Sequence, residues 1–319
     1  AHVLVRIKAA ALNARDLMVI SRDSASYPGP HAPDLVPCAD GAGIVEAVGE
    51  GSKWKEGERV IVSPASWLTG GYASEQLLEL EQFNSKGAGE SQGTLGEYLV
   101  VPDEELVRGP AYLSFEDLAA IPAAGATAIH ALFHGPKPLK KGQTVLAQGT
   151  GGVSCFVIQL AAAFGATVIA TSSSDAKLAQ ARALGATHTI NYTTHPTWSA
   201  EVQRLTANRG VDHVVDIAGA GTIEQSIAST KLGGVVTLVG FLSESKKTDV
   251  VMSVIFRAVT VYGLRMYTVE MIEECVRLME GRELRPAVEK VWGWGEGEVR
   301  GAFEMLREGR AVGKVVVKV

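Results

Sequence analysis

The stretch "VLAQGTGGVSCFVIQLAAAFGA", residues 145–166, decides the fold. Its first residues complete a short apolar strand, and an apolar helix follows the glycines. Between the two, Gly149, Gly151 and Ser154 have the spacing of G-x-G-x-x-G. Directly after a strand and at the start of a helix, this spacing is typical of a dinucleotide-binding turn. The free amide groups and the positive dipole end of such a helix bind a pyrophosphate.

Each small residue of this turn has a physical reason to be small. Gly149 permits the tight turn, Gly151 lets a pyrophosphate approach the backbone, and Ser154 lets the helix pack close to the strand. A tight strand-to-helix turn that binds no ligand is the alternative interpretation. We expect the turn to contribute the following residues to a cofactor site: Gly149, Thr150, Gly151, Gly152 and Val153.

Strands and helices alternate regularly around this turn. The strands are expected at residues 144–148, 167–172, 188–192, 211–218, 233–240 and 259–265, and the helices at 151–164, 175–184, 199–207, 223–230 and 269–279. Such alternation implies right-handed crossovers, so the sequence predicts a doubly wound parallel α/β sheet.

The first 110 residues have a different texture. Short runs rich in valine and isoleucine, bounded by Gly, Pro or Asp, lie at residues 2–9, 41–51, 57–64 and 95–106 and predict a small β-barrel. A Ser-x-x-Asp capping box at Ser114 begins a helical segment. A last strand is expected at 311–319, where the chain could return to the first domain.

Bulk composition fits a soluble, mildly acidic globular protein of about two domains. The chain has 319 residues, 46% hydrophobic and 20% charged, with a net charge of -5. This balance argues against a nucleic-acid partner. Residues 143–174 carry no charge, but glycines cut the run into pieces of strand and helix length, so we expect no membrane partner. Three widely spaced cysteines fit a reducing compartment, and a cytoplasmic location is expected.

The end of the second strand of the nucleotide-binding unit, "ATSSSDAKL" at 170–178, indicates which cofactor is bound. An NAD site usually has an acid here, which accepts hydrogen bonds from the ribose diol. The chain instead offers the hydroxyls of Ser172 and Ser173, the ammonium of Lys177 and, at the next strand end, Tyr192. These groups suit a 2′-phosphate, so NADP(H) is the expected cofactor. In the plainer interpretation, which can coexist, Ser174 or Asp175 caps a helix and Lys177 is solvated.

Several motifs in order resemble the medium-chain dehydrogenase/reductase superfamily, and more closely its zinc-independent quinone-reductase-like branch. They are a β-rich first domain, "GAGIVEAVGEG" followed by "GERV", then "IPAAGATAIHAL" and "GTGGVS". The resemblance implies a Rossmann domain at 125–265 and a GroES-like β-barrel catalytic domain made of 1–124 and 266–319. It also implies a homodimer, because sheet edges such as 259–265 pair across a two-fold axis in this superfamily.

Zinc alcohol dehydrogenases of the superfamily have metal ligands in three segments that this chain matches with other residues. Asn13 takes the place of a Cys, Ala39 with Asp40 that of a His-Glu pair, and Ala123 or Ala124 that of a further Cys or acid. A catalytic zinc needs about three protein ligands. No metal is therefore expected. His130 and His134 are one helical turn apart, but His134 is better explained as a cation at a helix C-terminus.

Without a metal, the easiest hydride acceptors are those that are already electrophilic, so a quinone or an α,β-unsaturated carbonyl is expected. The resemblance places Thr127 beside the nicotinamide and Val239, Gly240 and Phe241 at its carboxamide, with Ala218 also at the cofactor. Asn13 is expected at the nicotinamide ribose or the substrate oxygen. Tyr98 is a candidate proton donor or a packing residue, and Asp16 orients the Asn13 helix or has a functional role.

Other residues carry weaker expectations. Trp67 and Tyr72 would form an aromatic wall for a flat substrate or pin their loop, and Arg265 would face a cleft or a neighbouring subunit. Two alternatives to the reductase stay open. One is an NADP-dependent alcohol/carbonyl oxidoreductase; the other is a cofactor-binding protein with little catalysis.

Overall fold

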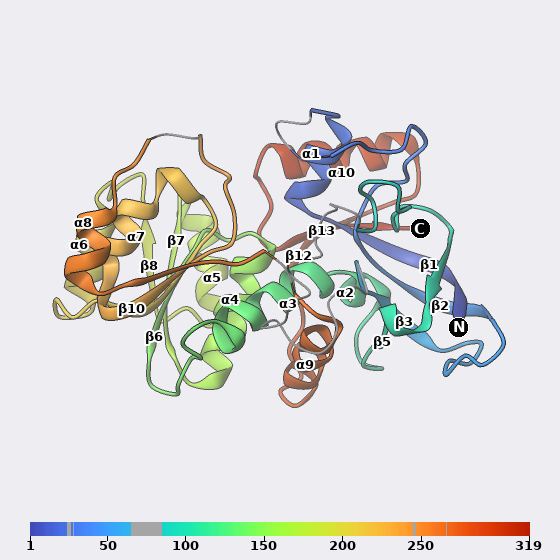
Figure 1. The fold of residues 1–319 in the computed structure, drawn as a ribbon, viewed down its shortest axis with the longest axis horizontal. Coiled ribbons are helices and arrows are strands. Elements are labelled where there is room, and N and C mark those ends of the chain that lie inside the picture. Colours follow the sequence, from blue (N-terminus) through green and yellow to red (C-terminus); the bar gives the residue numbers. More distant parts are fainter. Residues whose placement is uncertain (24–26, 28, 65–84, 245–246, 266) are drawn as a thin grey trace. The chain divides into compact units, whose positions relative to one another are not determined.

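The computed structural model describes residues 1–23, 27, 29–64, 85–244, 247–265 and 267–319. The chain divides into two compact units, one made of Ala1–Ala126 with Tyr267–Val319 and the other of Thr127–Met266. Each unit has its own sheet (Figure 1).

The second unit is built on a six-stranded parallel sheet in the order β11-β10-β9-β6-β7-β8. Its strands are β6 (Thr144–Gln148), β7 (Thr167–Ser172), β8 (His188–Asn191), β9 (Val211–Asp216), β10 (Thr230–Leu238) and β11 (Thr260–Gly263). The helices are α4 (Gly152–Phe164), α5 (Asp175–Ala183), α6 (Trp198–Leu205), α7 (Ile223–Ser229) and α8 (Val251–Arg257), with a short turn η4 (Gly219–Gly221). The strand order reverses between β6 and β9, which is the nucleotide-binding switch point of a doubly wound fold. The predicted Rossmann sheet is confirmed.

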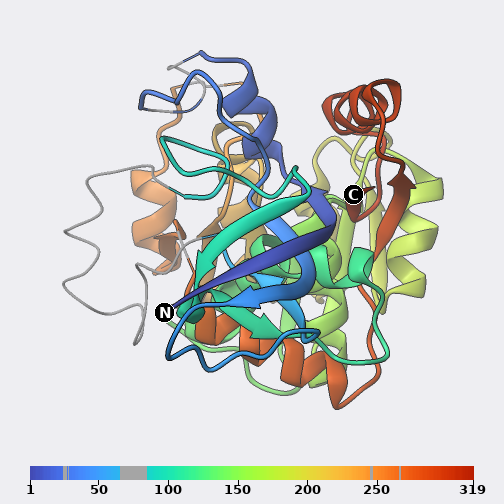
Figure 2. The same cartoon turned by 90° about the vertical axis from the view of Figure 1, so that its right-hand side faces the viewer.

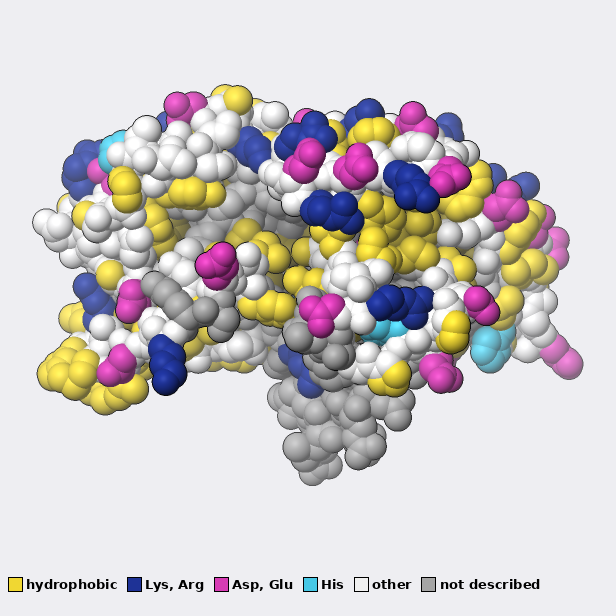
Figure 3. Space-filling model, turned by 90° about the horizontal axis from the view of Figure 1, so that it is seen from above, with side chains coloured by type: hydrophobic (Ala, Val, Ile, Leu, Met, Phe, Trp, Pro, Cys, Tyr) yellow, Lys and Arg dark blue, Asp and Glu magenta, His cyan; other side chains and the backbone are white. Residues whose placement is uncertain are grey.

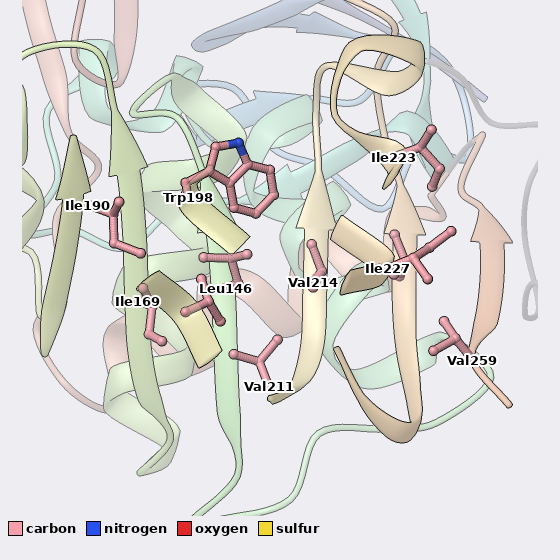
Figure 4. Packing of buried hydrophobic residues seen from close by; sticks show 11 residues of the cluster. Leu146, Ile169, Ile190, Trp198, Val211, Val214, Ile223, Ile227 and Val259 are labelled. Atoms are coloured by element: carbon pink, nitrogen blue, oxygen red, sulfur yellow. The ribbon is translucent and has the colours of Figure 1, made fainter. Parts of the chain in front are cut away.

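Apolar side chains from the strands and from α6 and α7 form one core of this unit. Figure 4 shows Leu146, Ile169 and Val214 of the sheet together with Trp198 of α6 and Ile227 of α7. The strands are rich in valine and isoleucine because they are covered by helices and need apolar side chains on both faces. The core therefore fixes the strands whose carboxyl ends carry the candidate cofactor residues.

The first unit contains a seven-stranded, mostly antiparallel sheet in the order β12-β13-β1-β2-β3-β5, with β4 also paired to β1. Figure 2 shows β1 of this unit in dark blue. Its strands are β1 (His2–Leu12), β2 (Asp40–Val48), β3 (Arg59–Val62), β4 (Tyr98–Pro102), β5 (Leu106–Arg108), β12 (Val288–Trp292) and β13 (Lys314–Lys318). Among the described residues, the helices of this unit are α1 (Ala14–Ile20), α2 (Phe115–Ala119), α9 (Val269–Glu280) and α10 (Glu296–Arg307), with the short helical turn η2 (Asp103–Glu105). Helix α3 (Pro122–Ile129) contains the boundary between the units, and the helical turn η3 (His130–His134) follows it in the second unit.

Two features of this unit differ from the expected elements. The run at 95–106 is not one strand, because η2 separates β4 from β5. Asp103 causes the break: its carboxylate accepts hydrogen bonds from Ser52 Oγ at 2.9 Å and Lys53 N at 2.9 Å, and its carbonyl accepts one from Trp54 Nε1 at 3.0 Å. The second difference is that β12 and α10 had no counterpart among the predicted elements.

The capping box predicted at Ser114 is confirmed. Ser114 Oγ accepts a hydrogen bond from Asp117 N at 3.1 Å, and the Asp117 carboxylate accepts one from Ser114 N at 3.1 Å. Among the described residues, no helix is long and apolar enough to cross a membrane.

Candidate active site

The glycine turn after β6 has the backbone geometry that a pyrophosphate needs. Gly149 has φ +71°, a left-handed conformation that favours glycine. A Cβ atom added at Gly151, the N-cap of α4, would meet no atom within 4 Å, so this face of the backbone is open. Ser154 is 2% exposed and its Oγ donates to the carbonyl of Gln148 at 2.6 Å, which ties the helix to the strand. The turn fits a dinucleotide phosphate at the N-terminus of α4.

Asp216, at the end of β9, organises the turn that follows that strand. Its buried carboxylate accepts hydrogen bonds from Ala218 N at 3.0 Å, Gly219 N at 2.8 Å and Thr222 Oγ1 at 2.8 Å. Because β9 pairs with β6, this turn lies beside the glycine turn at the same edge of the sheet. A side chain on Gly149 would come within 3.0 Å of Ile217 Cδ1. The sequence interpretation included Ala218 but missed Asp216, which holds it in place.

A chain of buried hydrogen bonds connects β6 with this aspartate. Gln148 Nε2 donates to Ser226 Oγ at 2.6 Å, and Ser226 Oγ donates to the Asp216 carboxylate at 2.6 Å. Gln148 immediately precedes Gly149. We call Gln148, Ser226 and Asp216 the relay, because they link the ends of two neighbouring strands through a side chain of α7.

The turn after β10 joins the same edge. Val239 N donates to the carbonyl of Asp216 at 2.8 Å, and Ser243 Oγ donates to the carbonyl of Ala218 at 2.6 Å. A Cβ atom at Gly240 would collide with the carbonyl oxygen of Ile217, so only glycine fits there. The structure thus brings Ala218, Val239 and Gly240 together, while the side chain of Phe241 is exposed.

The corner predicted to bind the adenosine phosphate contains no carboxylate at the end of β7. Ser172 is buried there and Ser173 is exposed. Tyr192 N donates to the carbonyl of Ser172 at 3.0 Å, which places Tyr192 next to the two serines. Lys177 lies in the first turns of α5, which begins three residues after Ser172.

The capping residues of the same corner differ in what they do. Ser174 is the N-cap of α5, but its side chain makes no capping hydrogen bond. Asp175 accepts a hydrogen bond from Asn191 Nδ2 at 2.8 Å. The acid nearest to the serines in sequence is therefore bound to a neighbouring strand end.

Asn13, in the first unit, belongs to a buried polar network. Its Nδ2 donates to Asp40 Oδ2 at 3.0 Å, and its Oδ1 accepts from Lys314 Nζ at 2.7 Å. Lys314 Nζ also donates to Asp40 Oδ2 at 3.1 Å and to the carbonyl of Leu12 at 2.9 Å. Ala123 N donates to Asp40 Oδ1 at 3.1 Å. Asp40 and Lys314 are 0% and 3% exposed.

Asp16 lies at the edge of this network. Its Oδ2 accepts a hydrogen bond from Asn13 N at 2.8 Å, so it caps the first turn of α1, as one of the two interpretations required. Burial raises the pKa of Asp16 to about 6, against the lowering effect of Arg15, whose Nε lies 3.6 Å from Oδ1. Burial, followed by the charge of Asp40, also raises the pKa of Tyr267 well above its usual range. The ionisable groups on this side of the unit are therefore buried in a low-dielectric environment.

The other predicted residues lie on elements different from those that carry Asn13 and Asp40. Tyr98 is on β4, 52% exposed, with its backbone paired to Arg6. Thr127 is buried in the last turns of α3. His130 is buried and its Nε2 is 2.9 Å from the hydroxyl of Tyr262. Trp67 and Tyr72 lie outside the described residues.

The three segments that correspond to zinc ligands do meet in space, at Asn13, Asp40 and Ala123. Their donor set does not fit zinc, because only Asp40 offers a carboxylate and both of its oxygens already accept hydrogen bonds from protein groups. Within the described ranges, no group of three or more His, Cys, Asp or Glu could hold a metal ion.

Comparison with known proteins agrees with this architecture. Residues 1–111 match the alcohol dehydrogenase GroES-like domain, and residues 152–281 match the zinc-binding dehydrogenase family. The chain is 36% identical to a zinc-type alcohol dehydrogenase-like protein of Schizosaccharomyces pombe, over 100% of this chain and 91% of that protein. It is 30% identical to the chloroplastic NADPH-dependent alkenal/one oxidoreductase of Arabidopsis thaliana, over 99% of this chain and 72% of that protein.

A solved structure supports the same assignment. The crystal structure of an NAD-dependent alcohol dehydrogenase superposes with a TM-score of 0.87 at 36% identity, covering 100% of this chain and 92% of that one. The fold is thus shared over the whole chain with an NAD-dependent enzyme. The chain belongs to the medium-chain dehydrogenase/reductase superfamily and is an oxidoreductase that uses a nicotinamide cofactor.

Proposed function

We propose that the chain is an NADPH-dependent, metal-free oxidoreductase that transfers hydride to a quinone or an α,β-unsaturated carbonyl. The observation that carries the cofactor choice is the corner formed by Ser172, Ser173, Lys177 and Tyr192, where hydroxyls and an ammonium stand in place of a carboxylate. A carboxylate there would repel a 2′-phosphate, whereas hydroxyl and ammonium groups bind it through charge-assisted hydrogen bonds.

The substrate class follows from the residues around Asn13. The nicotinamide, when bound, supplies the hydride. Because the segment of Asn13, Asp40 and Ala123 has no donor set for zinc, the protein contributes position and hydrogen bonds instead of a Lewis acid. Such a site suits a carbonyl or quinone that is electrophilic through conjugation. The Arabidopsis alkenal/one oxidoreductase is a relative whose name describes this chemistry.

The second candidate function is an NADP-dependent oxidation of alcohols or reduction of carbonyls. It is favoured by the similarity to the zinc-type and NAD-dependent alcohol dehydrogenases. Turnover of a simple alcohol with NADP would support it. Tight NADPH binding with no turnover of quinones, enones or aldehydes would instead support a cofactor-binding protein with little catalysis.

The location that we propose is the cytoplasm, since Cys38, Cys155 and Cys275 are buried and form no disulfide. No nucleic acid or membrane partner is proposed. The partner that we propose is a second copy of the chain.

The test of the cofactor assignment is a pair of substitutions in the adenosine corner. Ser172→Asp and Lys177→Ala should each lower kcat/KM with NADPH by about tenfold or more, since each weakens charge-assisted hydrogen bonds to the 2′-phosphate. The values with NADH should change little, or rise for Ser172→Asp. Initial rates with a quinone and an enone, read from NADPH absorbance, measure both ratios.

Lys140→Ala is the matched control, because this exposed lysine precedes β6 at the opposite end of the strand. An unchanged NADPH to NADH ratio in both variants would refute the assignment. Loss of both cofactors in equal measure would indicate a folding defect, which thermal unfolding of the same samples would detect.

A further inference from the structure

Lys314 is a buried cation whose hydrogen bonds are all made inside the first unit. Its ammonium has three N–H groups, and three acceptors surround it: Leu12 O at 2.9 Å, Asn13 Oδ1 at 2.7 Å and Asp40 Oδ2 at 3.1 Å. The side chain is 3% exposed. An ammonium with this coordination has no donor left for a ligand, so its role is to act on the groups that surround it.

Asp40 is the group that needs this charge. Its side chain is completely buried, and its two oxygens accept hydrogen bonds from Asn13, Lys314 and Ala123. Thr94 Oγ1 fixes its backbone by donating to the Asp40 carbonyl at 2.7 Å. A carboxylate buried in this way is strongly destabilising if the neighbouring cation is removed.

The other nearby cation has a different partner. Arg15 Nε lies 3.6 Å from Asp16 Oδ1, and its Nη1 donates to Ser85 Oγ at 3.1 Å. The two buried acids are thus each associated with one cation, Asp16 with Arg15 and Asp40 with Lys314.

We propose that Lys314 supplies a permanent cation where the segments of Asn13, Asp40 and Ala123 meet, which are the segments that carry the metal ligands in zinc enzymes of the superfamily. Together with Asp40, Lys314 fixes the direction of the Asn13 amide. Rotating that amide by 180° would put Nδ2 against the ammonium and Oδ1 against the carboxylate, and both contacts are repulsive. The observed orientation is therefore the stable one, and it leaves the second Nδ2 hydrogen of Asn13 pointing in a single direction. Asp40 and Lys314 are positioning residues for Asn13.

The charge arrangement is independent of the proposed function, and only the use of Asn13 in hydride transfer rests on it. A first experiment therefore measures stability and metal content. Lys314→Met, Asp40→Asn and the double variant would be compared with wild type by thermal unfolding at pH 7. Lys318→Met is the matched control, because it is the same change on the same strand at an exposed position.

Lys314→Met should lower the melting temperature by roughly 10 °C, as expected when one partner of a buried ion pair is lost, and Lys318→Met by far less. The double variant should melt above Asp40→Asn, because it no longer buries an unpaired ammonium. This second comparison holds even if Lys314→Met does not fold. After incubation with Zn²⁺ and dialysis, elemental analysis of the wild type should find no stoichiometric zinc.

Three results would overturn the proposal: equal melting temperatures for the two Lys→Met variants, a double variant whose loss equals the sum of the single losses, or one zinc per wild-type chain. The positioning role has its own readout. The double variant should bind NADPH with unchanged Kd while kcat for the quinone or enone falls, and an unchanged kcat would refute positioning. If the wild type turned over no quinone or enone, the proposed function would fail but the coupling between Lys314 and Asp40 would stand.

Discussion

Asn13 is the N-cap of α1 and Asp16 lies in the first turn of this helix, yet their side chains are stabilised very differently. Both ends of the Asn13 amide are hydrogen-bonded, to Asp40 and Lys314. Asp16 Oδ1 is buried without a hydrogen bond, and its cation, Arg15, lies 3.6 Å away. The burial cost is therefore only partly offset, which is why the pKa of Asp16 rises to about 6.

This raised pKa predicts that ionisation of Asp16 lowers the free energy of unfolding in a pH-dependent way. The unfolded chain has the ordinary pKa of 3.8 at this residue, so between about pH 4 and 6 the folded state binds more protons. Stability is thus lost as pH rises through that window, by up to about 3 kcal/mol. Asp16→Asn removes the cost and keeps an oxygen that accepts from Asn13 N. We expect the variant to be more stable than wild type by about 1–3 kcal/mol at pH 8 and to lose this advantage toward pH 4.

Urea unfolding at several pH values between 4 and 8 measures this difference. Asp34→Asn, at an exposed position, is the control and should show no comparable pH dependence. A stability difference for Asp16→Asn that does not vary with pH would contradict the explanation.

The sequence made Asn13 a candidate through family resemblance, but it could not reveal Lys314. The two residues are 301 positions apart and meet because β1 pairs with β13 in the register Leu12↔Val315. In the strand pattern, Lys314 is simply the polar residue before an apolar run. Only the register shows that its side chain is buried beside two polar groups.

At the level of secondary-structure elements, the relay connects the ends of β6 and β9 through hydrogen bonds. Ser226 of α7 accepts from Gln148 and donates to Asp216, and Asp216 holds the backbone of Ala218 and Gly219. The Ser226 hydroxyl thus contacts the strand ends that precede two turns of the candidate cofactor site. Removing the Ser226 hydroxyl should therefore lower both the stability of the protein and its affinity for the cofactor.

Ser226→Ala is therefore expected to lower the free energy of unfolding by about 1–3 kcal/mol, because buried polar groups on both sides lose a partner. It should also raise the Kd for NADPH, since both turns loosen. Urea unfolding and isothermal titration calorimetry would measure the two effects.

Ser229→Ala is the matched control on the same helix. Ser229 is also fully buried, but its hydroxyl only donates to the carbonyl of Gln225 at 2.8 Å, one turn earlier. Its loss should leave NADPH binding unchanged. If both serine variants bound NADPH as tightly as wild type, the relay would have no role in shaping the site.

Elements were predictable where local pattern and tertiary environment agree. The parallel strands and their helices follow from apolar runs broken by glycine, because a strand covered on both faces needs such a run. The break between β4 and β5 was not predictable, since the contacts of Asp103 come from Ser52 and Lys53, about 50 residues away. Likewise, the spacing of Gly149 and Gly151 predicted a phosphate site from the sequence. The role of Asp216 could not be predicted, because no sequence motif indicates its hydrogen bonds.

At the scale of the whole molecule, the second unit exposes a cluster of large apolar side chains on one surface. Four residues of the short helix α8, Val251, Met252, Ile255 and Phe256, are 62–73% exposed. Figure 3 shows hydrophobic side chains gathered at the left end of the view, where Figure 1 places α8. The chain continues from α8 into β11, the edge strand of the described sheet. A strand edge beside an apolar helix suits self-pairing across a two-fold axis.

We therefore expect a homodimer in which α8 and β11 of two copies pack together. Phe256→Glu should convert it to a monomer, because a two-fold axis would bury the added carboxylate in both copies without a partner. Size-exclusion chromatography with light scattering should give twice the chain mass of 33.7 kDa for wild type and the single mass for the variant. Leu232→Glu, at an equally exposed position outside α8 and β11, should remain dimeric. A monomeric wild type would show that this face does not pair. A dimeric Phe256→Glu variant would show that the dimer interface lies elsewhere.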